Sequence, residues 1–426
     1  MKTMMNSKAF SFGFFLKFAA CFVLLALAYR SFLSTFARFS AAPVPATATA
    51  DHTSPPSLPV DLLRSKTVKC DLFKGDWVED DEGPFYTNET CDSIQTHQNC
   101  MKNGRPDTDY MHWRWEPSGC ELPRFNPAKF LNLMRNKSMA FIGDSIMRNH
   151  VQSLLCILSL EEKAKEVYHD DQYKSRRWHF PANNFTLSVV WSPYLTKATI
   201  SEDDEGVSTD IVRLHLDKLD NVWTQQFKNF DYAVIAGGKW YTKPAIYYEK
   251  GEIVGCHSCG VKNNITNIGF YYAYRKALRS ALRYILSSSS NQQKVKVLFR
   301  TTTPDHFENG EWDTGGYCNR TVPFRGGEVE MGSMDGVMHR IEVEEFEWAL
   351  GMGSKNVGVG GMELFDTTYL SLLRPDGHPG IYRHPHPLAI QNDCLHWCLP
   401  GPIDSWNDLM MEMLFPQSKT KNEPRL

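Results

Sequence analysis

The stretch FIGDSIMRNH, residues 141–150, decides the fold, because an apolar segment stops at Gly143 and a helical pattern begins at Ser145. The preceding SMAFIG (138–143) is a short apolar run, which is typical of a strand buried on both faces. The following residues, 146–160, place a row of apolar side chains on one helical face: Val151, Leu154, Leu155 and Leu158. A strand, a tight turn and a helix are therefore predicted here.

The same alternation of strand and helix continues along the chain. Four more short, β-rich runs are FTLSVVWS (185–192), DYAVIAGG (231–238), VKVLFRTTT (295–303) and MELFD (362–366). Helical patterns lie between them, at 271–286 and 340–350. Strands that alternate with helices predict a doubly wound α/β fold with a mainly parallel sheet and right-handed crossovers. The active site of such a sheet lies at the carboxyl ends of its strands.

That position gives Ser145 a possible chemical role. A serine between a buried strand and a helix lies where free N–H groups and the helix dipole would stabilise an oxyanion, as in the nucleophile elbow of hydrolases. The alternative is that Asp144 or Ser145 only caps the helix, because both residue types are good N-caps.

A nucleophilic serine needs a base, and the base needs an orienting group. Among the 14 histidines, His396 has Asp393 three residues earlier, and side chains at this spacing face one another within a helical turn. Asp376 and His378 form a second candidate pair in a Pro/Gly loop. The alternative for His396 is a purely structural role between two cysteines.

The N-terminus indicates entry into the secretory pathway. Residues 12–29 are apolar except for Lys17 and nearly long enough to span a bilayer. We expect a tail and uncleaved membrane anchor over 1–39, with a cleaved signal peptide as the alternative. Residues 40–66 are rich in Pro, Ala, Ser and Thr and are expected to form a stem. The remainder, 67–426, is then a lumenal catalytic domain.

Sequons and cysteines agree with a lumenal location. Five glycosylation sequons occur, at Asn88, Asn136, Asn184, Asn264 and Asn319. Ten of the 11 cysteines lie beyond the apolar segment, an even number that predicts disulfides in an oxidising compartment. The alternative is a zinc site built from CHSC (256–259) and CLHWC (394–398).

Composition excludes some partners. The formal net charge is −3, and no basic stripe along the chain suggests nucleic acid. No bound cofactor and no metal are expected.

Five blocks carry a resemblance to a known family. They are CDLFKGDWVEDDEGPFY (70–86), CELPRF (120–125), IGDSIMRNHVQSLLCIL (142–158), RTTTPDHFENGEWDTGGYC (300–318) and DCLHWCLPGPIDSWND (393–408). Together they resemble the plant trichome birefringence-like family, of the SGNH/GDSL esterase type. The resemblance implies a single-pass type II Golgi membrane protein that O-acetylates cell-wall polysaccharides, and the subgroup it resembles most acts on xyloglucan. It implies Ser145 as nucleophile, His396 as base and Asp393 as orienting acid.

The resemblance also implies five disulfides and an internal organisation. The disulfide pairs are Cys70–Cys120, Cys91–Cys156, Cys100–Cys398, Cys318–Cys394 and Cys256–Cys259. Within the lumenal part, we expect a Cys-rich region (67–135) stapled by disulfides, an SGNH-like core with large loop insertions (136–412) and a flexible tail (413–426).

One position departs from the family pattern. VIAGGKW has Ala236 where many members carry the asparagine that helps to stabilise the oxyanion. Backbone groups around Asp144, Ser145, Gly237 and Gly238 would have to take over that task, or another side chain would replace the amide.

The expected reaction moves an acetyl group from a co-substrate, acetyl-CoA or another acetyl carrier, through Ser145 to a sugar hydroxyl. Three alternatives stay open: an acetyl esterase, an acetyltransferase acting on mannan or xylan, and an inactive polysaccharide-binding protein. Trp113, Trp115 and Trp240 could stack on sugar rings, although core packing is the favoured role of each.

Overall fold

The computed structural model describes residues 70–200, 211–260, 264–288, 295–353, 361–385 and 391–417, which lie in one compact unit spanning Lys66–Leu426. The predicted anchor (1–39) and stem (40–66) lie outside the described residues. Within the described ranges, no helix is long and apolar enough to cross a membrane.

The central sheet has seven strands within the described residues, in the order β13-β12-β9-β3-β6-β5-β4. Five neighbouring strands are parallel: β3 (Ser138–Gly143), β6 (Phe185–Trp191), β9 (Tyr232–Ile235), β12 (Lys296–Arg300) and β13 (Met362–Phe365). These are the five strands predicted from the apolar runs, which confirms the mainly parallel α/β fold. At one edge, β4 (Lys165–His169) and β5 (Arg176–Phe180) are antiparallel.

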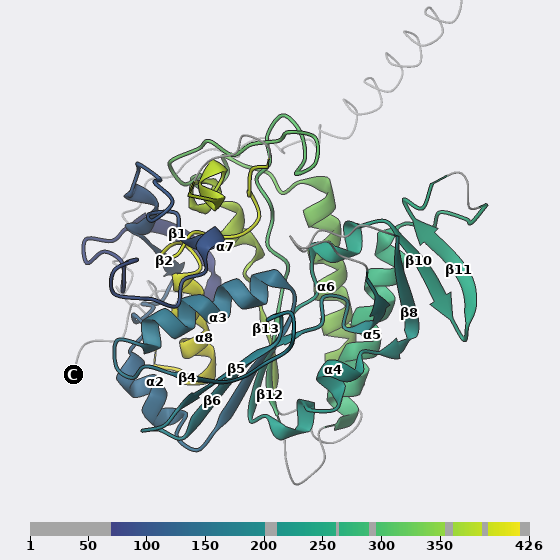
Figure 1. Cartoon of the computed structure of the whole chain (residues 1–426), viewed down its shortest axis with the longest axis horizontal. Coiled ribbons are helices and arrows are strands. Elements are labelled where there is room, and N and C mark those ends of the chain that lie inside the picture. The colour runs from purple at the N-terminus through teal and green to yellow at the C-terminus, as the bar shows by residue number, and fades with distance from the viewer. Residues whose placement is uncertain are drawn as a thin grey trace, which may run out of the picture. The chain divides into compact units, whose positions relative to one another are not determined.

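Helices cover both faces of this sheet (Figure 1). The strand β3 explains how, because Met139 and Phe141 point into one apolar cluster while Ala140 and Ile142 point into another. The first cluster also holds residues of α2 (Pro127–Leu133), α3 (Ser145–Leu158) and α8 (Asp404–Leu414). The second holds residues of α4 (Asn221–Thr224), α5 (Phe270–Ser288) and α6 (Ser333–Gly353).

Smaller elements surround this core. A four-stranded sheet of described residues consists of β7 (Thr196–Thr199), β8 (Val212–Leu219), β10 (Ala245–Glu249) and β11 (Glu252–His257). The pair β1 (Asp71–Glu79) and β2 (Trp113–Ser118) belongs to the N-terminal region and contacts α7 (Thr368–Leu372). Short 3₁₀ turns are η1 (Thr96–Gln98), η2 (Asp109–Met111), η3 (Phe227–Asn229), η4 (Lys239–Thr242), η6 (Pro375–Gly377) and η7 (Ile381–Arg383).

The described residues form five disulfides, with the same pairing that the resemblance implies. Cys91–Cys156 ties the N-terminal region to α3, and Cys70–Cys120 brings the residue before β1 close to the end of β2. All four thiols of the alternative zinc site are oxidised, because Cys256 pairs with Cys259 and the other two pair with distant cysteines.

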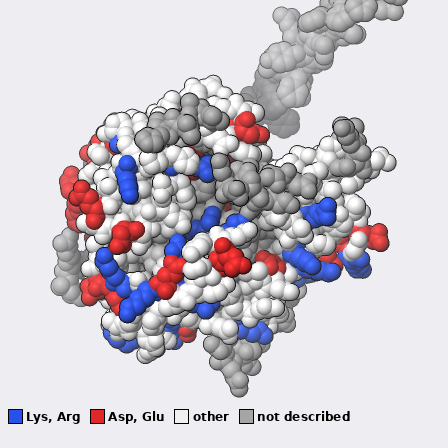
Figure 2. Space-filling model, viewed as in Figure 1, with Lys and Arg blue, Asp and Glu red and all other residues white. Residues whose placement is uncertain are grey.

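The surface agrees with the small net charge. On the face shown in Figure 2, basic and acidic side chains are interspersed.

Four of the predicted sequon asparagines are exposed and Asn88 is half-buried. The exposed four are Asn136, Asn184, Asn264 and Asn319.

Candidate active site

The corner between β3 and α3 needs its glycine. Gly143 has a φ of +155°, and a Cβ on it would lie 2.8 Å from the carbonyl oxygen of Ala236. Asp144 is the N-cap, since its carboxylate accepts a hydrogen bond from the backbone N–H of Ile146 at 3.0 Å. The capping alternative therefore describes Asp144, and Ser145 is the first residue of the helix with its hydroxyl free for another partner.

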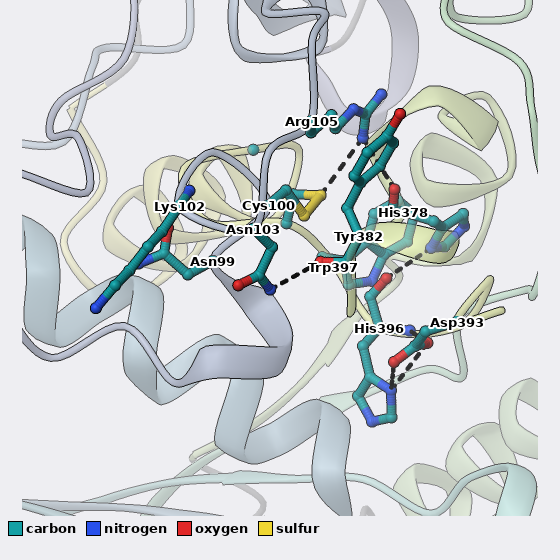
Figure 3. Close-up of a disulfide and its surroundings, with 12 residues drawn as sticks. Asn99, Cys100, Lys102, Asn103, Arg105, His378, Tyr382, Asp393, His396 and Trp397 are labelled. Atoms are coloured by element: carbon teal, nitrogen blue, oxygen red, sulfur yellow. Dashed lines mark hydrogen bonds and ion pairs between the residues drawn. A yellow bond between two sulfur atoms is a disulfide. The ribbon is translucent and has the colours of Figure 1, made fainter. Parts of the chain in front are cut away.

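That partner is His396. Its Nε2 lies 2.8 Å from Ser145 Oγ, although 251 residues separate the two along the chain. On the other side of the imidazole, Nδ1 lies 2.9 Å and 3.1 Å from the two carboxylate oxygens of Asp393. Figure 3 shows the Asp393 carboxylate facing the His396 ring. The structure thus brings the predicted serine, histidine and aspartate into one hydrogen-bonded row.

The carboxylate at the end of this row is ionised. Burial by itself raises the pKa of Asp393, but the charge and hydrogen bonds of His396 outweigh it and hold that pKa well below its ordinary value. The backbone N–H groups of Leu395 and His396 also donate to Asp393 Oδ1, at 3.2 Å and 2.9 Å. Because Asp393 can only accept, Nδ1 carries the imidazole proton and Nε2 is left to accept the Ser145 hydroxyl proton.

The loop that carries His396 is held by two disulfides and by hydrogen bonds, and Figure 3 shows the disulfide of Cys100 beside it. Cys100–Cys398 and Cys318–Cys394 attach it to two distant parts of the chain. Asn149, one turn after Ser145, donates to the carbonyl of Trp397 at 3.2 Å and accepts from its N–H at 2.8 Å. The same helix therefore carries Ser145 and clamps the backbone next to His396.

The second candidate pair, Asp376 and His378, does not form. The Asp376 carboxylate makes a fully buried ion pair with Arg374 at 2.7 Å. The His378 ring stacks on Trp397, and its Nδ1 lies 2.7 Å from the carbonyl oxygen of His396. Burial, together with the neighbouring His306, lowers the pKa of His378 well below its ordinary value, so the ring is neutral. His378 thus supports the loop of His396.

The residues around the departure from the family pattern are tightly packed. Ala236 is buried and offers no side-chain donor. A Cβ on Gly238 would lie 2.2 Å from the Asp144 carboxylate, and one on Gly237 would lie 2.6 Å from the Tyr274 ring. Both glycines are buried, and neither donates its N–H to another described residue. Their role toward an oxyanion stays a prediction.

All three tryptophans belong to or pack against the apolar clusters of the core. Trp115 is 1% exposed and belongs to the core, which leaves no face for a sugar. Trp113 is half-buried against the same cluster. Trp240 is also half-buried, with its ring edge-on to Trp191 at the end of β6.

Sequence reasoning missed three neighbours of the site. The ring of His97 lies 6.1 Å from that of His396, and burial together with His396 lowers its pKa to about 3. Nothing near His97 in the sequence points to this contact. Arg148 and Asn149 lie in the same stretch as Ser145. Their spacing of three and four residues from it predicts that they share its side of the helix.

Comparison with known families agrees with this fold. Residues 122–413 match a family described as a GDSL/SGNH-like acyl-esterase family found in Pmr5 and Cas1p, and residues 68–121 match the PMR5 N-terminal domain. The chain therefore belongs to the GDSL/SGNH-like acyl-esterases, within the trichome birefringence-like family that the sequence blocks indicate.

Named relatives lie within the same family. Protein trichome birefringence-like 25 of Arabidopsis thaliana is 52% identical over 96% of this chain and 94% of its own. Xyloglucan O-acetyltransferase 1 of Populus trichocarpa is 43% identical over 82% of each chain. The Arabidopsis thaliana protein of the same name is 43% identical over 81% of this chain and 80% of its own.

Proposed function

We propose that this protein is a polysaccharide O-acetyltransferase that moves an acetyl group through Ser145 onto a sugar hydroxyl of a plant cell-wall polymer, xyloglucan in particular. The observation that carries the proposal is the row of hydrogen bonds from Ser145 Oγ through His396 to Asp393. The names of two relatives, both xyloglucan O-acetyltransferases, favour the polymer.

The first half-reaction loads the serine. As Ser145 Oγ attacks the acetyl carbonyl carbon of the donor, His396 Nε2 takes the hydroxyl proton and Asp393 stabilises the resulting imidazolium. N–H groups of Ser145, Gly237 and Gly238 would stabilise the tetrahedral oxyanion in place of the absent asparagine. When the intermediate collapses, the donor's leaving group receives the proton from His396 and acetyl-Ser145 remains.

The second half-reaction uses the same groups in reverse. A sugar hydroxyl gives its proton to His396 Nε2 while its oxygen attacks the acetyl carbon of acetyl-Ser145. Collapse returns the proton to Ser145 Oγ and releases the acetylated sugar. Water in place of the sugar would make the protein an esterase, so the proposal also requires that the bound acceptor excludes water.

The experiment offers the full chain an acetyl donor, acetyl-CoA, together with separate oligomers of xyloglucan, mannan and xylan, and reads their mass. We expect xyloglucan to gain 42 Da per acetyl group, a mass increment fixed by acyl-transfer chemistry. A gain of mass on mannan or xylan oligomers instead would identify that polymer as the acceptor. Loss of acetyl from pre-acetylated oligomers would indicate the esterase, and neither change would indicate the binding protein.

For the location, we propose a type II Golgi membrane protein with residues 67–426 in the lumen. The exposed sequons and the oxidised cysteines support an oxidising, glycosylating compartment. A membrane-bound protein that resists extraction by high salt and retains residues 10–30 is expected, whereas a soluble form that starts near residue 30 would show cleavage.

A further inference from the structure

One helical turn after the nucleophile, α3 presents a cation. Within the described stretch 141–150, Ser145 and Arg148 are the two residues that are not buried, so they share the open side of the helix. The guanidinium carbon of Arg148 lies 4.8 Å from the ring centre of Trp191. Its Nε is buried and has no hydrogen-bond partner among the described residues, and no ion pair there involves Arg148.

Two lysines and a second indole extend this arrangement. Lys174 Nζ lies 5.4 Å from the ring centre of Trp191, whose ring meets that of Trp240 edge-on at 5.4 Å. Lys243 Nζ lies 4.1 Å from the ring centre of Trp240. We call Arg148, Lys174, Trp191, Trp240 and Lys243 the cation–indole shelf.

The shelf lies at the reactive edge of the sheet. Trp191 ends β6 and pairs with Gly143, which ends β3 directly before the Asp144-Ser145 corner. Trp240 follows the glycine pair beyond the end of β9, the strand on the other side of β3. One indole therefore ends β6 and the other lies in η4 just beyond β9, the two strands that flank β3.

The acidic groups that face Arg148 are bound to the backbone. Asp144 accepts from Ile146 N–H, and Asp170 accepts from the N–H groups of Lys174 and Ser175, both at 2.7 Å. Burial lowers the pKa of Arg148 and that of Lys174, the latter also through its closeness to Arg148. A partly desolvated guanidinium without a hydrogen-bonded anion is costly, and an anionic ligand would relieve that cost.

We propose that the cation–indole shelf binds the phosphate groups of a phosphate-bearing acetyl donor and so places its acetyl group at Ser145. This inference rests on the proposed acetyl transfer. Xyloglucan is built from neutral sugars and needs no cation, whereas guanidinium groups suit phosphate oxygens. The competing anion, a carboxylate of an acidic polysaccharide acceptor, becomes an outcome of the test.

The test compares a charged donor, acetyl-CoA, with an uncharged one, 4-nitrophenyl acetate, on the full chain. For Arg148→Gln, we expect KM for acetyl-CoA to rise at least about tenfold more than KM for the neutral ester, as one lost charge-assisted contact predicts. Arg148→Lys should recover part of this difference. Pyrophosphate should compete with acetyl-CoA in the wild type and lose at least about tenfold in affinity in Arg148→Gln.

Arg283→Gln is the matched control. Arg283 stacks on Trp348 at 4.9 Å, almost the same geometry as Arg148 on Trp191, but on α5. It should leave both donors unaffected. Equal losses with the two donors in Arg148→Gln would overturn the proposal. So would a raised KM for an oligogalacturonide acceptor with an unchanged donor KM, which would assign the shelf to a uronate.

Calorimetric binding of pyrophosphate separates the two proposals, because it needs no turnover. Pyrophosphate binding to the wild type that weakens with Arg148→Gln and with added salt, when that wild type transfers no acetyl, would support the shelf and reject the proposed function. Acetyl transfer by a wild type that does not bind pyrophosphate would support the proposed function and reject the shelf. Should Arg148→Gln fail to fold, Arg148→Lys and the salt dependence of the wild-type KM for acetyl-CoA decide the question.

Discussion

At the scale of single residues, the proposed transfer depends on a proton that passes from Ser145 Oγ to His396 Nε2 while Asp393 stays ionised. Ser145→Ala removes the atom that would carry the acetyl group, and His396→Ala removes its base. Both variants should lose acetyl transfer by a factor of at least about 10³ while folding normally. Mass spectrometry measures acetyl transfer, and circular dichroism measures folding. Near wild-type turnover in a folded Ser145→Ala protein would contradict the covalent mechanism.

Asp393 acts through the imidazole, so its variant tests orientation. Asp393→Asn presents an amide that can donate to Nδ1 and so favours the wrong tautomer, which should lower kcat by about 10⁴. Asp376→Asn is the matched control, because Asp376 pairs with Arg374 in the same C-terminal region without touching His396. A larger loss of kcat in the control than in Asp393→Asn would contradict the assignment.

At the scale of elements, the clamp from α3 to the loop of His396 connects packing to catalysis. Asn149→Ala breaks both hydrogen bonds to Trp397 and leaves a buried N–H and C=O without partners. We expect a loss of stability of about 2–3 kcal/mol and a fall in kcat of about 10² from misplacement of His396. Urea unfolding and steady-state kinetics measure the two effects.

A second buried asparagine provides the control for that clamp. Asn183 donates to Glu162 at 2.9 Å near the start of β6, the end of the strand opposite Trp191. Asn183→Ala should cost stability but leave kcat within about twofold, since nothing it contacts belongs to the site. Equal kcat losses in the two variants would show that Asn149 has no positioning role.

At the scale of the whole molecule, the long disulfide Cys100–Cys398 joins the N-terminal region of the described residues to the loop of His396. Cys100 and Cys398 are 298 residues apart, whereas Cys256 and Cys259 are 3 apart. The double variant Cys100→Ser/Cys398→Ser should lose up to about 5 kcal/mol of stability in the chain-entropy model and much of its activity. Cys256→Ser/Cys259→Ser should lose far less, and thermal unfolding compares the two.

Reduction provides an independent reading of the cysteines. Dithiothreitol should inactivate the protein without releasing metal, because the thiols near His396 are disulfide-bonded in the structure. Free thiols at Cys394 and Cys398 in a peptide map, or stoichiometric zinc, would revive the metal site.

Stability should also depend on pH through a buried acid on α8. Burial raises the pKa of Asp408 to about 7, although its carboxylate accepts the N–H of Phe125 at 2.8 Å. The folded state therefore holds this proton more tightly than the unfolded state. The stabilisation is complete below about pH 4 and is lost as the pH rises toward and through 7. Asp408→Asn should flatten the fall of the unfolding midpoint between about pH 4 and 7, and an unchanged slope would contradict this.

Much of the architecture was predictable because short stretches of sequence show the pattern of each strand and helix. Strands buried on both faces are continuous apolar runs, which identified β3, β6, β9, β12 and β13, and apolar helical faces identified α3, α5 and α6. The strands β7, β8, β10 and β11 were missed. They contain no continuous apolar run, because several carry polar or charged side chains on one face, as the alternating VRLHLDKL of β8 does, so the search for apolar runs passed over them.

The site divides in the same way. The corner at Ser145 and the spacing of Asp393 and His396 are local, so the sequence by itself indicated all three residues and their chemistry. Only the tertiary structure decided that His378 supports the loop, and that His97 and the cation–indole shelf lie near Ser145 and His396. The physical reason is that these contacts join segments tens to hundreds of residues apart, and no local pattern encodes the packing that brings them together.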